Sequence, residues 1–549
     1  MHYGRILKNC RMCNSENIYK FLDLGFAPPS DAILTKEELS EPELQFPLTV
    51  YQCQNCGLAQ LGYAVNPVLM YGEKYRYESS ITETGRKHFH EMADSICDKF
   101  NLSPGSFVID FGSNVGVLLE GFKIRNMRIL GIDPAPKIVK IANERGIETL
   151  QEFVNQEVAL KVVSERGKAK IIAATNVFAH IDDKEELMQS VKIMLDEDGV
   201  FIIEAPYFVD LIEDMEYDTI YLDHLEYLSI KPLVNFFKRY DMEVFDVERY
   251  EIHGKSIRVF VCRNGQRKVS QNVQELLDLE QNKKIYEKET LDKFAKKVEQ
   301  HKKDFLNLLR ELKKQGKKIV GISSPAKGNT LLNYCKINTD LIDYMTEKSL
   351  IKRGLYTPGM HIPIVGDEKL LEDKPDYGVI FAWNFADEII KNHQEFSNLG
   401  GKFIKPIPTP TIIDKTEENW GFKVKKINPV FIDERGEISD LLNNPINHVG
   451  LITTKAGAVR GEHYHKLSTQ YSYILSGKFE VLIARVDNPK QIKKIILNAG
   501  EIVTISPRTI HKFRAIEDSV MVDMISESRT GTNYETDVVR VKIEENQEK

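Results

Sequence analysis

The amino-acid sequence predicts a multidomain α/β protein with a small metal-binding module at one end and an all-β domain at the other. Three observations support this: two Cys-x-x-Cys pairs near the start, apolar segments alternating with helical stretches over residues 104–413, and β-rich segments after residue 420. Alternating strands and helices favour a parallel sheet covered by helices, whereas many short strands favour a sandwich or barrel. We predict a zinc-binding module in 1–72, a Rossmann-like domain in 73–270, a helical connector with a second α/β subdomain in 271–419, and the β domain in 420–549.

Length and composition limit the classes of function open to the chain. Its 549 residues suit three or four domains, and 42% hydrophobic with 28% charged residues is ordinary for a globular protein. The net charge of −7 argues against a surface dedicated to nucleic acid or to anionic membranes. No apolar run is long enough to span a bilayer. We therefore expect neither nucleic-acid nor membrane partners.

The start of the chain and its cysteines predict the cellular compartment. The first ten residues lack the apolar core of a signal peptide, and seven cysteines, an odd count, fit a disulfide framework poorly. Both features favour a reducing, cytoplasmic location.

Four cysteines have the spacing of metal ligands. Cys10 with Cys13 and Cys53 with Cys56 form two short knuckles, each of which lets both sulfurs face one ion. Four thiolates suit tetrahedral zinc and leave no open coordination position, so we predict a structural zinc site. Four unrelated thiols and a redox pair are weaker alternatives, because no thioredoxin-type strand and helix surround either pair.

Four short apolar segments predict parallel strands of a doubly wound sheet. Three of them end in an acidic residue, and the first is followed at once by a glycine-rich turn. Such segments alternate with helical stretches, as in parallel α/β sheets. The predicted strands are residues 106–110, 128–133, 170–176 and 199–204.

The glycine-rich turn predicts a bound cofactor. Asp110, Gly112, Asn114 and Gly116 lie where a strand passes into a helix, and glycines there allow a ligand to approach the backbone closely. Asp133 ends the next strand, where an acid accepts hydrogen bonds from ribose hydroxyls. An acid that opens the turn, and a spacing unlike Gly-x-Gly-x-x-Gly, favour S-adenosylmethionine; a nicotinamide cofactor and a turn made only for packing are the alternatives.

A charged helical stretch and a second, smaller α/β unit follow. Residues 271–316 predict a long solvated connecting helix or hairpin. Strands are expected at 317–323 and 376–381, with the loop 324–328 after the first of them, so the second α/β unit covers about 317–413.

Taken together, the motifs of residues 1–413 resemble the sugar C-3 methyltransferases that act on nucleotide-linked 4-keto-deoxysugars. Each motif alone is weak, but the set is specific. It comprises the cysteine pairs, Tyr75-Arg-Tyr77, the turn from Asp110 to Gly116, Asn176-Val-Phe-Ala-His180, Glu204-Ala-Pro206, Tyr221-Leu-Asp-His224, His253-Gly-Lys-Ser-Ile-Arg258, Pro325-Ala-Lys-Gly-Asn329 and Pro358-Gly-Met-His-Ile-Pro363.

The resemblance implies carbon methylation through an enolate. A carbon beside a ketone is acidic, so the enzyme needs a base near that carbon, donors toward the enolate oxygen and a methyl donor. The resemblance places the base at His224, with Tyr221 and Asp223 beside it. The family pattern is Tyr-His-Glu-His, whereas this chain has Tyr-Leu-Asp-His, so the shorter acid can alter the pose of the substrate.

Further residues are assigned to ligands by the same resemblance. His180 and a tyrosine of the pair Tyr75 and Tyr77 are expected to contact the sugar, and Asn176 the cofactor. For His180 a structural role is an equal alternative. Lys327 is expected to hold a diphosphate oxygen, or else to be a solvated loop lysine.

The C-terminal β domain resembles the cupins. The segment with His463 and His465 matches the first cupin motif, but Gln470 stands where metal-binding cupins have glutamate, and His511 lies in the second motif. Three histidines would suit a metal, although the missing acid weakens this interpretation. The segment around Arg460 instead resembles the metal-free cupins that isomerise or epimerise nucleotide-linked 4-keto sugars.

In those cupins a histidine moves a proton next to the ketone. The resemblance therefore makes His463 or His465 the base, Arg460 a phosphate contact and Tyr473 the acid on the opposite face. Metal-free cupins of this type pair, so a homodimer through residues 420–549 is expected. A purely structural dimerisation barrel is the alternative.

The combined prediction is a bifunctional enzyme of deoxysugar biosynthesis. One site would use S-adenosylmethionine to methylate C-3 of a nucleotide-linked 4-keto-6-deoxyhexose, with dTDP as the nucleotide. The cupin would epimerise or isomerise a related 4-keto sugar. The alternatives are a C-methyltransferase with a non-catalytic cupin for binding or oligomerisation, and a nicotinamide oxidoreductase on the same α/β fold.

Overall fold

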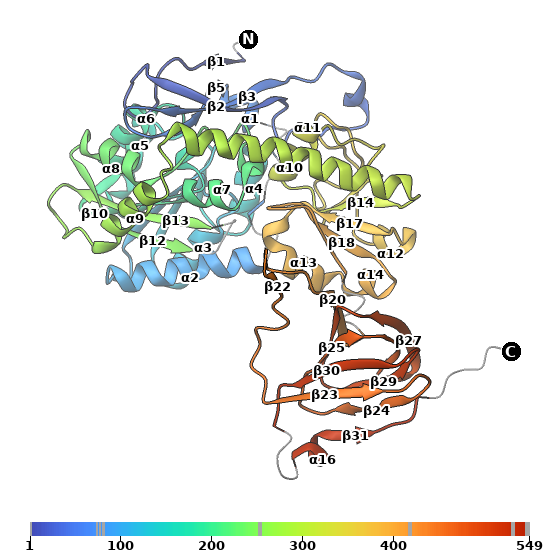
Figure 1. The fold of residues 1–549 in the computed structure, drawn as a ribbon. Coiled ribbons are helices and arrows are strands. Elements are labelled where there is room, and N and C mark those ends of the chain that lie inside the picture. Colours follow the sequence, from blue (N-terminus) through green and yellow to red (C-terminus); the bar gives the residue numbers. More distant parts are fainter. Residues whose placement is uncertain are drawn as a thin grey trace. The chain divides into compact units, whose positions relative to one another are not determined.

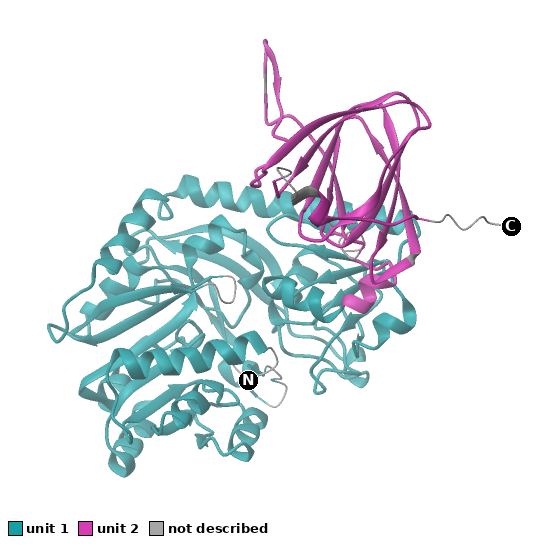
Figure 2. Cartoon of the chain, turned by 90° about the horizontal axis from the view of Figure 1, so that it is seen from below, with its two compact units in different colours: residues 1–393, 403–412 teal, residues 394–402, 413–549 magenta. Residues whose placement is uncertain are grey.

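The chain forms two compact units (Figures 1 and 2). The computed structural model describes residues 3–72, 75, 78–79, 83–250, 255–414, 420–528 and 533–543. The first unit comprises Met1–His393 with Phe403–Ile412, and the second comprises Gln394–Lys402 with Ile413–Lys549. The predicted zinc module, the Rossmann-like domain and nearly all of the second α/β subdomain therefore belong to one unit.

A small antiparallel sheet forms the N-terminal module. Its order is β11-β4-β3-β2, and a separate strand pair joins β1 to β5. Strand β11 comes from far along the sequence, so the module shares a sheet with the next domain. The elements are β1 (Gly4–Ile6), β2 (Ile18–Ala27), η1 (Glu37–Ser40), β3 (Phe46–Cys53), β4 (Ala59–Leu61), β5 (Tyr63–Val65), α1 (Pro67–Met70) and β11 (Glu226–Tyr227).

A seven-stranded sheet forms the core of the Rossmann-like domain, in the order β12-β13-β10-β9-β6-β7-β8. The four predicted strands pair in parallel, as expected. Strand β13 runs antiparallel to both of its neighbours, β10 and β12. The strands are β6 (Phe107–Phe111), β7 (Arg128–Ile132), β8 (Thr149–Leu150), β9 (Ala169–Thr175), β10 (Leu195–Pro206), β12 (Met242–Tyr250) and β13 (Ser256–Arg263).

The order of this sheet reverses between β6 and β9. From β6 the chain builds outward to β7 and β8, then returns to add β9 on the other side of β6. Ligands of open α/β sheets bind outside the carboxyl ends of the strands at such a switch point. The helices of this domain are α2 (Glu83–Lys99), α3 (Val117–Ile124), α4 (Pro136–Glu144), α5 (Gln156–Arg166), η2 (Phe178–His180), α6 (Lys184–Met194), α7 (Phe208–Glu213), η3 (Tyr217–Thr219) and α8 (Ile230–Lys238).

The charged stretch forms two helices, α9 (Gln271–Asn282) and α10 (Lys288–Lys314). The prediction of a solvated connector is wrong for α10, because one of its faces is buried in the core. Leu291, Val298 and Phe305 on that face have no exposed surface. Their spacing of seven residues puts them on one side of the helix, a pattern that the dense charges obscured.

The second α/β subdomain is built on a six-stranded sheet in the order β16-β15-β14-β17-β18-β19. The predicted strands are found as β14 and β17, which pair in parallel. The elements are β14 (Ile319–Ile322), α11 (Ala326–Cys335), β15 (Met345–Thr346), β16 (Ile364–Val365), α12 (Lys369–Asp373), β17 (Tyr377–Ile380), η4 (Trp383–Phe385), α13 (Ala386–Asn392), α14 (Gln394–Asn398), β18 (Lys402–Lys405) and β19 (Thr411–Ile413).

The second unit contains the predicted β domain, whose main part is two five-stranded antiparallel sheets. Their orders are β20-β28-β25-β30-β23 and β27-β26-β29-β24-β31. One short helix, α16 (Asn533–Asp537), was not predicted. The strands are β20 (Phe422–Lys426), β21 (Phe431–Asp433), β22 (Gly436–Ile438), β23 (His448–Thr454), β24 (Val459–His465), β25 (Gln470–Ser476), β26 (Lys478–Arg485), β27 (Asn488–Asn498), β28 (Glu501–Ile505), β29 (Thr509–Ala515), β30 (Ser519–Ile525) and β31 (Val538–Arg540).

Candidate functional site

The glycine turn follows β6 at the switch point of the sheet, as predicted. Gly112 has φ +59° and Gly116 has φ +82°, in the left-handed region where a Cβ is strained. A Cβ on Gly112 would lie 2.4 Å from Cγ2 of Val177, and one on Gly116 would lie 2.5 Å from Cγ2 of Ile147. Both positions therefore require glycine for conformation and for space.

Two buried acids flank the turn. Asp133 accepts hydrogen bonds from the backbone amides of Asn114 (3.0 Å, to Oδ2) and Ala135 (2.9 Å, to Oδ1). Asp110 is buried, and its Oδ1 has no hydrogen-bond partner within the described residues. Burial raises the pKa of both carboxyls, that of Asp110 strongly. A buried carboxyl oxygen without a hydrogen-bond partner costs free energy, and a bound ligand that donates a hydrogen bond to it removes that cost. The site therefore fits a ligand with donor or cationic groups.

One cavity of about 1300 Å³ joins this turn to the predicted catalytic residues, and all of its lining belongs to the first unit. Residues from the N-terminal module, the Rossmann-like domain and the second α/β subdomain contribute to its wall. Gly116 is not part of the wall. The predicted site residues that line it are Cys10, Tyr75, Asp110, Gly112, Asn114, Asp133, Asn176, His180, Tyr221, Asp223, His224 and Lys327.

A hydrogen bond from Nδ1 holds the ring of His224 in place. Its Nδ1 lies 2.7 Å from the carbonyl oxygen of Thr219. A carbonyl only accepts, so Nδ1 donates, and the neutral ring carries its lone pair on Nε2. The Tyr221 ring lies over this imidazole, with centroids 4.0 Å apart and planes inclined by 34°. The arrangement fixes the ring and its tautomer, as a general base requires.

His180 lies next to His224, with ring centroids 5.0 Å apart. Its Nδ1 is 3.3 Å from the hydroxyl of Tyr71. Burial lowers the pKa of His180 well below its usual value, and the nearby His224 and Lys184 lower it further. His180 is therefore a neutral group in the cavity wall.

The predicted tyrosines are only partly described. Tyr75 lines the cavity and packs edge-on against Tyr71, with centroids 5.4 Å apart, whereas Tyr77 lies outside the described residues. Sequence reasoning missed Tyr71, which lines the cavity beside both Tyr75 and His180. No spacing in the sequence distinguishes it.

Asp223 lies fully inside the protein, next to His224 in the chain. Burial, reinforced by the charge of Asp31, raises the pKa of Asp223 to about 8, and its Oδ2 has no hydrogen-bond partner in the described structure. Asp31 itself pairs with Lys352, whose Nζ lies 3.3 Å from Oδ1 of Asp31 and donates to the carbonyl of Ser324 at 3.0 Å. Asp31 and Lys352 also line the cavity and were not predicted.

Lys327 is at the start of α11, in the wall of the cavity. Its Nζ lies 4.5 Å from the centroid of the Trp383 ring. Burial lowers the pKa of Lys327, while the nearby acids Asp218 and Glu216 oppose that shift. The lysine is therefore not a freely solvated loop residue, and buried acids already balance part of its charge.

Two of the sequence motifs meet in a buried ion pair. Arg258 Nε and Nη2 lie 2.9 and 2.7 Å from Oε2 of Glu204, and both residues are almost fully buried. Nε2 of His88 lies 2.6 Å from the other carboxylate oxygen. These contacts tie α2 and β13 to the end of β10, beside the cavity.

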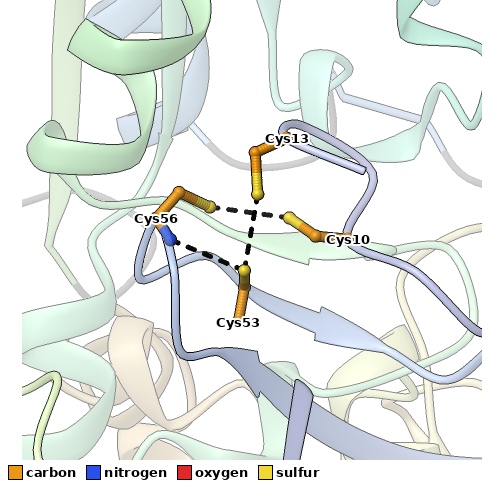
Figure 3. A group of neighbouring side chains, drawn as sticks. All are labelled: Cys10, Cys13, Cys53 and Cys56. Atoms are coloured by element: carbon orange, nitrogen blue, oxygen red, sulfur yellow. Dashed lines mark hydrogen bonds between the residues drawn. The ribbon is translucent and has the colours of Figure 1, made fainter. Parts of the chain in front are cut away.

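The four cysteines come together as predicted (Figure 3). Their Sγ atoms all lie within 4.8 Å of one another, and the pairs Cys10–Cys56 and Cys13–Cys53 are each separated by 3.5 Å. Sulfurs bound tetrahedrally to zinc at about 2.3 Å lie about 3.8 Å apart, so the donor set fits that ion. The backbone amide of Cys56 points to Sγ of Cys53 at 3.5 Å, as in metal-binding knuckles.

A second cluster of side chains lies in the β domain. The rings of His463 and His511 are 4.6 Å apart on paired strands, and His465 completes a group whose ligand atoms lie within 4.8 Å of one another. His465 Nδ1 is 2.8 Å from Oδ2 of Asp537, and its Nε2 is 3.2 Å from Oε1 of Gln470. Both ring nitrogens of His465 therefore lie within hydrogen-bond distance of side-chain oxygens.

Arg460 and Tyr473 are the other two residues predicted for the cupin site. Arg460 is exposed and donates to the carbonyl of Thr453 at 3.0 Å. Tyr473 packs in an apolar cluster with Tyr471, on the face of β25 opposite to Gln470. The prediction of Tyr473 as the acid facing the histidines is therefore wrong, because residues at odd spacing on a strand point to opposite faces.

Family comparisons cover most of the chain. Residues 10–71 match a "Putative zinc binding domain", residues 85–247 a methyltransferase domain, residues 251–408 a C-methyltransferase C-terminal domain and residues 450–526 a cupin domain. The chain is 33% identical over 410 residues to C-methyltransferase NovU of Streptomyces niveus, covering 74% of this chain and 97% of that protein. These matches confirm the predicted fold classes. No helix in the described ranges is both long and apolar enough to cross a membrane.

Comparison with solved structures gives partial matches. A QdtA 3,4-ketoisomerase from Thermoanaerobacterium thermosaccharolyticum, in complex with TDP, is 25% identical, with a TM-score of 0.19 over 22% of this chain and 87% of that one. ChmJ, a 3'-monoepimerase from Streptomyces bikiniensis in complex with dTDP-quinovose, is 18% identical, with a TM-score of 0.19 over 21% and 67%. TM-scores this low carry no conclusion about the activity of this chain.

Proposed function

Because the chain belongs to the C-methyltransferase family, we propose that its first unit methylates C-3 of a nucleotide-linked 4-keto-6-deoxyhexose, with dTDP as the nucleotide. One observation carries the proposal: a single cavity is lined both by the cofactor turn and by His180, Tyr221 and His224. Carbon methylation requires a base and a methyl donor at the same carbon. The shared cavity provides room for both ligands.

In the proposed mechanism His224 is the base. Its Nε2 takes the proton from C-3, and the electrons of that C–H bond move into an enolate whose charge lies on the C-4 oxygen. The hydrogen bond from Nδ1 to Thr219 keeps the ring oriented and supports the imidazolium that forms. Tyr221 holds the ring by stacking, and His180 and Tyr75 are placed to contact the sugar.

Asp223 is the proposed donor to the enolate oxygen. A carboxyl with a pKa of about 8 is protonated at neutral pH and can donate a hydrogen bond. Its buried Oδ2 has no partner among the described residues, and the residue lines the cavity. Lys327, in the same wall, is the proposed diphosphate contact.

The cofactor turn fits S-adenosylmethionine, which when bound supplies the electrophilic methyl group that the enolate carbon attacks. Asp133 would accept from the ribose hydroxyls, Asp110 would face donor groups of the cofactor, and Gly112, Asn114 and Asn176 would line the pocket. Gly116 does not line the cavity but would keep the turn in its left-handed conformation. Zinc at the four cysteines is proposed as structural, because four thiolates leave no open coordination position.

Incubation with labelled S-adenosylmethionine and a panel of nucleotide-linked sugars tests the proposal. We expect label transfer to 4-keto-6-deoxy sugars and none to the matching sugars with a hydroxyl at C-4, because only the ketone acidifies C-3. Equal transfer to both sets would contradict an enolate mechanism. Binding of NAD in preference to S-adenosylmethionine would favour the oxidoreductase alternative.

For the cupin we propose epimerisation or isomerisation of a related 4-keto sugar. The contact between His465 and Asp537 supports it, because a carboxylate that accepts from Nδ1 fixes the orientation of the imidazole. His463 lies beside it as the second candidate. A non-catalytic cupin is the alternative, and a metal at the three histidines is a further one.

Deuterium exchange in the full chain separates these alternatives. His224→Asn removes the proposed base of the first site, so any deuterium that enters the keto sugar from D2O would come from the cupin. We expect exchange that EDTA leaves unchanged and that His465→Asn abolishes. No exchange would favour the non-catalytic cupin, and loss with EDTA would favour the metal.

We also propose a cytoplasmic homodimer formed through the cupin. Strand β23 is an edge of its sheet, and Val449 and Leu451 on it are 58% and 68% exposed. Exposed apolar edge strands favour pairing with another chain. Light scattering of the wild-type protein and of Leu451→Lys tests it; a monomeric wild type would contradict it.

A further inference from the structure

A buried ionic network joins the zinc module to the segments that carry the two histidines of the cavity. It consists of Arg11, Asp182, Lys184 and Glu226. We infer that this network positions His180 and His224, so that the zinc module is part of the scaffold of the active site. The inference rests on the proposed function for the roles of the histidines, but the contacts do not depend on it.

The first link is a strand shared by both parts. Strand β11 begins at Glu226, two residues after His224, and pairs with β4 of the zinc module. The amide of Leu61 donates to the carbonyl of Leu225 at 2.9 Å, and the amide of Leu225 donates to the carbonyl of Ala179 at 3.0 Å. The module therefore holds the segment after His224 directly, and that segment holds the turn of His180.

The second link starts inside a zinc knuckle. Arg11 lies between Cys10 and Cys13, and its side chain is 1% exposed. Its Nε lies 3.1 Å from Oδ1 of Asp182, and its Nη1 donates to the carbonyl of Leu61 at 2.7 Å. Asp182 is two residues beyond His180, so the first knuckle is tied to the end of the histidine turn.

The third link encloses that turn. Nζ of Lys184 donates to the carbonyls of Phe178 (2.5 Å) and Ile181 (2.7 Å), which bracket His180. The same ammonium lies 3.1 Å from Oε2 of Glu226, and the side chains of both are almost fully buried. A buried charge that loses its partner is strongly unfavourable, so moving the Lys184 ammonium away from Glu226 would cost free energy.

These links have a consequence for catalysis. Arg11, Asp182 and Lys184 also line the cavity. Their polar side-chain atoms contact backbone carbonyls and acidic partners around the histidine segments, so we assign them as positioning residues. A base is effective only when it lies within hydrogen-bond reach of the proton, and a misplacement of about 1 Å costs about 100-fold in rate. Breaking the contacts of Arg11 or those of Lys184 should therefore lower kcat more than it changes substrate binding.

The experiment compares three variants of the full chain. Lys184→Met and Arg11→Gln break the network, whereas Lys20→Gln is the matched control. Lys20 also belongs to the zinc module and lies 2.7 Å from Asp23, but its side chain is 48% exposed and it does not line the cavity. We expect kcat to fall about 10- to 100-fold in the first two variants. KM, the affinity for S-adenosylmethionine and the content of one zinc per chain should stay within about twofold, as should all values of the control.

Hydrogen–deuterium exchange gives a readout without a substrate. Peptides covering residues 176–184 and 219–228 should exchange faster in Lys184→Met and Arg11→Gln than in Lys20→Gln. If these variants fold poorly, Arg11→Lys keeps the charge but loses the two-point contact, and it should show the same changes more weakly. Unchanged kcat and unchanged exchange in a folded, zinc-loaded variant would overturn the inference. Wild-type protein without activity on any keto sugar would overturn the proposed function instead.

Discussion

His224 donates from Nδ1 to the carbonyl oxygen of Thr219 at 2.7 Å, which leaves the lone pair of the neutral ring on Nε2. This contact links the loop after η3 to the chemistry of the cavity. His224 lines the same cavity as the cofactor turn, which is where the proposed base has to act.

Replacing His224 should abolish methyl transfer. His224→Ala is expected to lower kcat by about 10²- to 10⁴-fold, because proton abstraction loses its base. The affinity for S-adenosylmethionine, measured by calorimetry, should change less than twofold. His361→Ala is the control, since that histidine lies outside the cavity lining. Substantial turnover by His224→Ala would remove this residue from the role.

The rate should fall as the pH rises through about 8. Asp223 donates only while protonated, and burial raises its pKa to about 8, so the active form is lost above that pH. A carboxyl whose pKa is raised on folding also destabilises the fold progressively as the pH rises from about 4 toward 8.

Asp223→Asn distinguishes this effect from other titrations. The amide keeps a donor and cannot ionise, so kcat should lose its alkaline limb. The variant should also resist urea better than the wild type at pH 7 and equally at pH 3. An unchanged alkaline limb would contradict a donor role for Asp223.

Adding a side chain at Gly112 tests whether the turn contacts the cofactor. Gly112→Ala would bring a Cβ to 2.4 Å from Val177 in a left-handed backbone, whereas Gly105→Ala has φ +84° and no atom within 4 Å. Both should lose about 1–2 kcal/mol of stability from backbone strain. Only Gly112→Ala should also weaken S-adenosylmethionine binding, by about tenfold or more. Equal affinities would show that the turn does not contact the cofactor.

Metal content tests the zinc site. The wild-type protein should hold one zinc per chain by atomic absorption, and Cys53→Ser should hold none and unfold at lower temperature. Cys97→Ala is the control, because that buried cysteine lies outside the cluster. A control that also loses the metal, or a Cys53→Ser variant that keeps it, would contradict the assignment.

Local patterns allowed much of this protein to be predicted. The cysteine knuckles and the turn from Asp110 to Gly116 are short motifs whose residues lie together in the chain, so spacing alone reveals them. Asp31, Tyr71 and Lys352 reach the same cavity from three distant segments, and no spacing in the sequence marks such residues.

The errors have physical causes as well. The buried face of α10 was hidden by charges on its other faces, although residues such as Leu291 and Val298 repeat every seven positions. Tyr473 was assigned to the histidine side of the barrel, but the alternation of β25 places it on the opposite face from Gln470. The networks around Lys184 and Glu204 depend on pairs of residues more than 40 positions apart.

The position of the transferred methyl group is the most direct test of methylation at C-3 through an enolate. The wild-type protein would be incubated with S-adenosylmethionine carrying a 13C-methyl group and a dTDP-linked 4-keto-6-deoxyhexose deuterated at C-3, and the product examined by NMR. We expect a 13C-methyl group bonded to C-3, with the C-3 deuterium lost and no product from His224→Ala. A methyl group on oxygen, or on C-3 with the deuterium retained in the sugar, would contradict it.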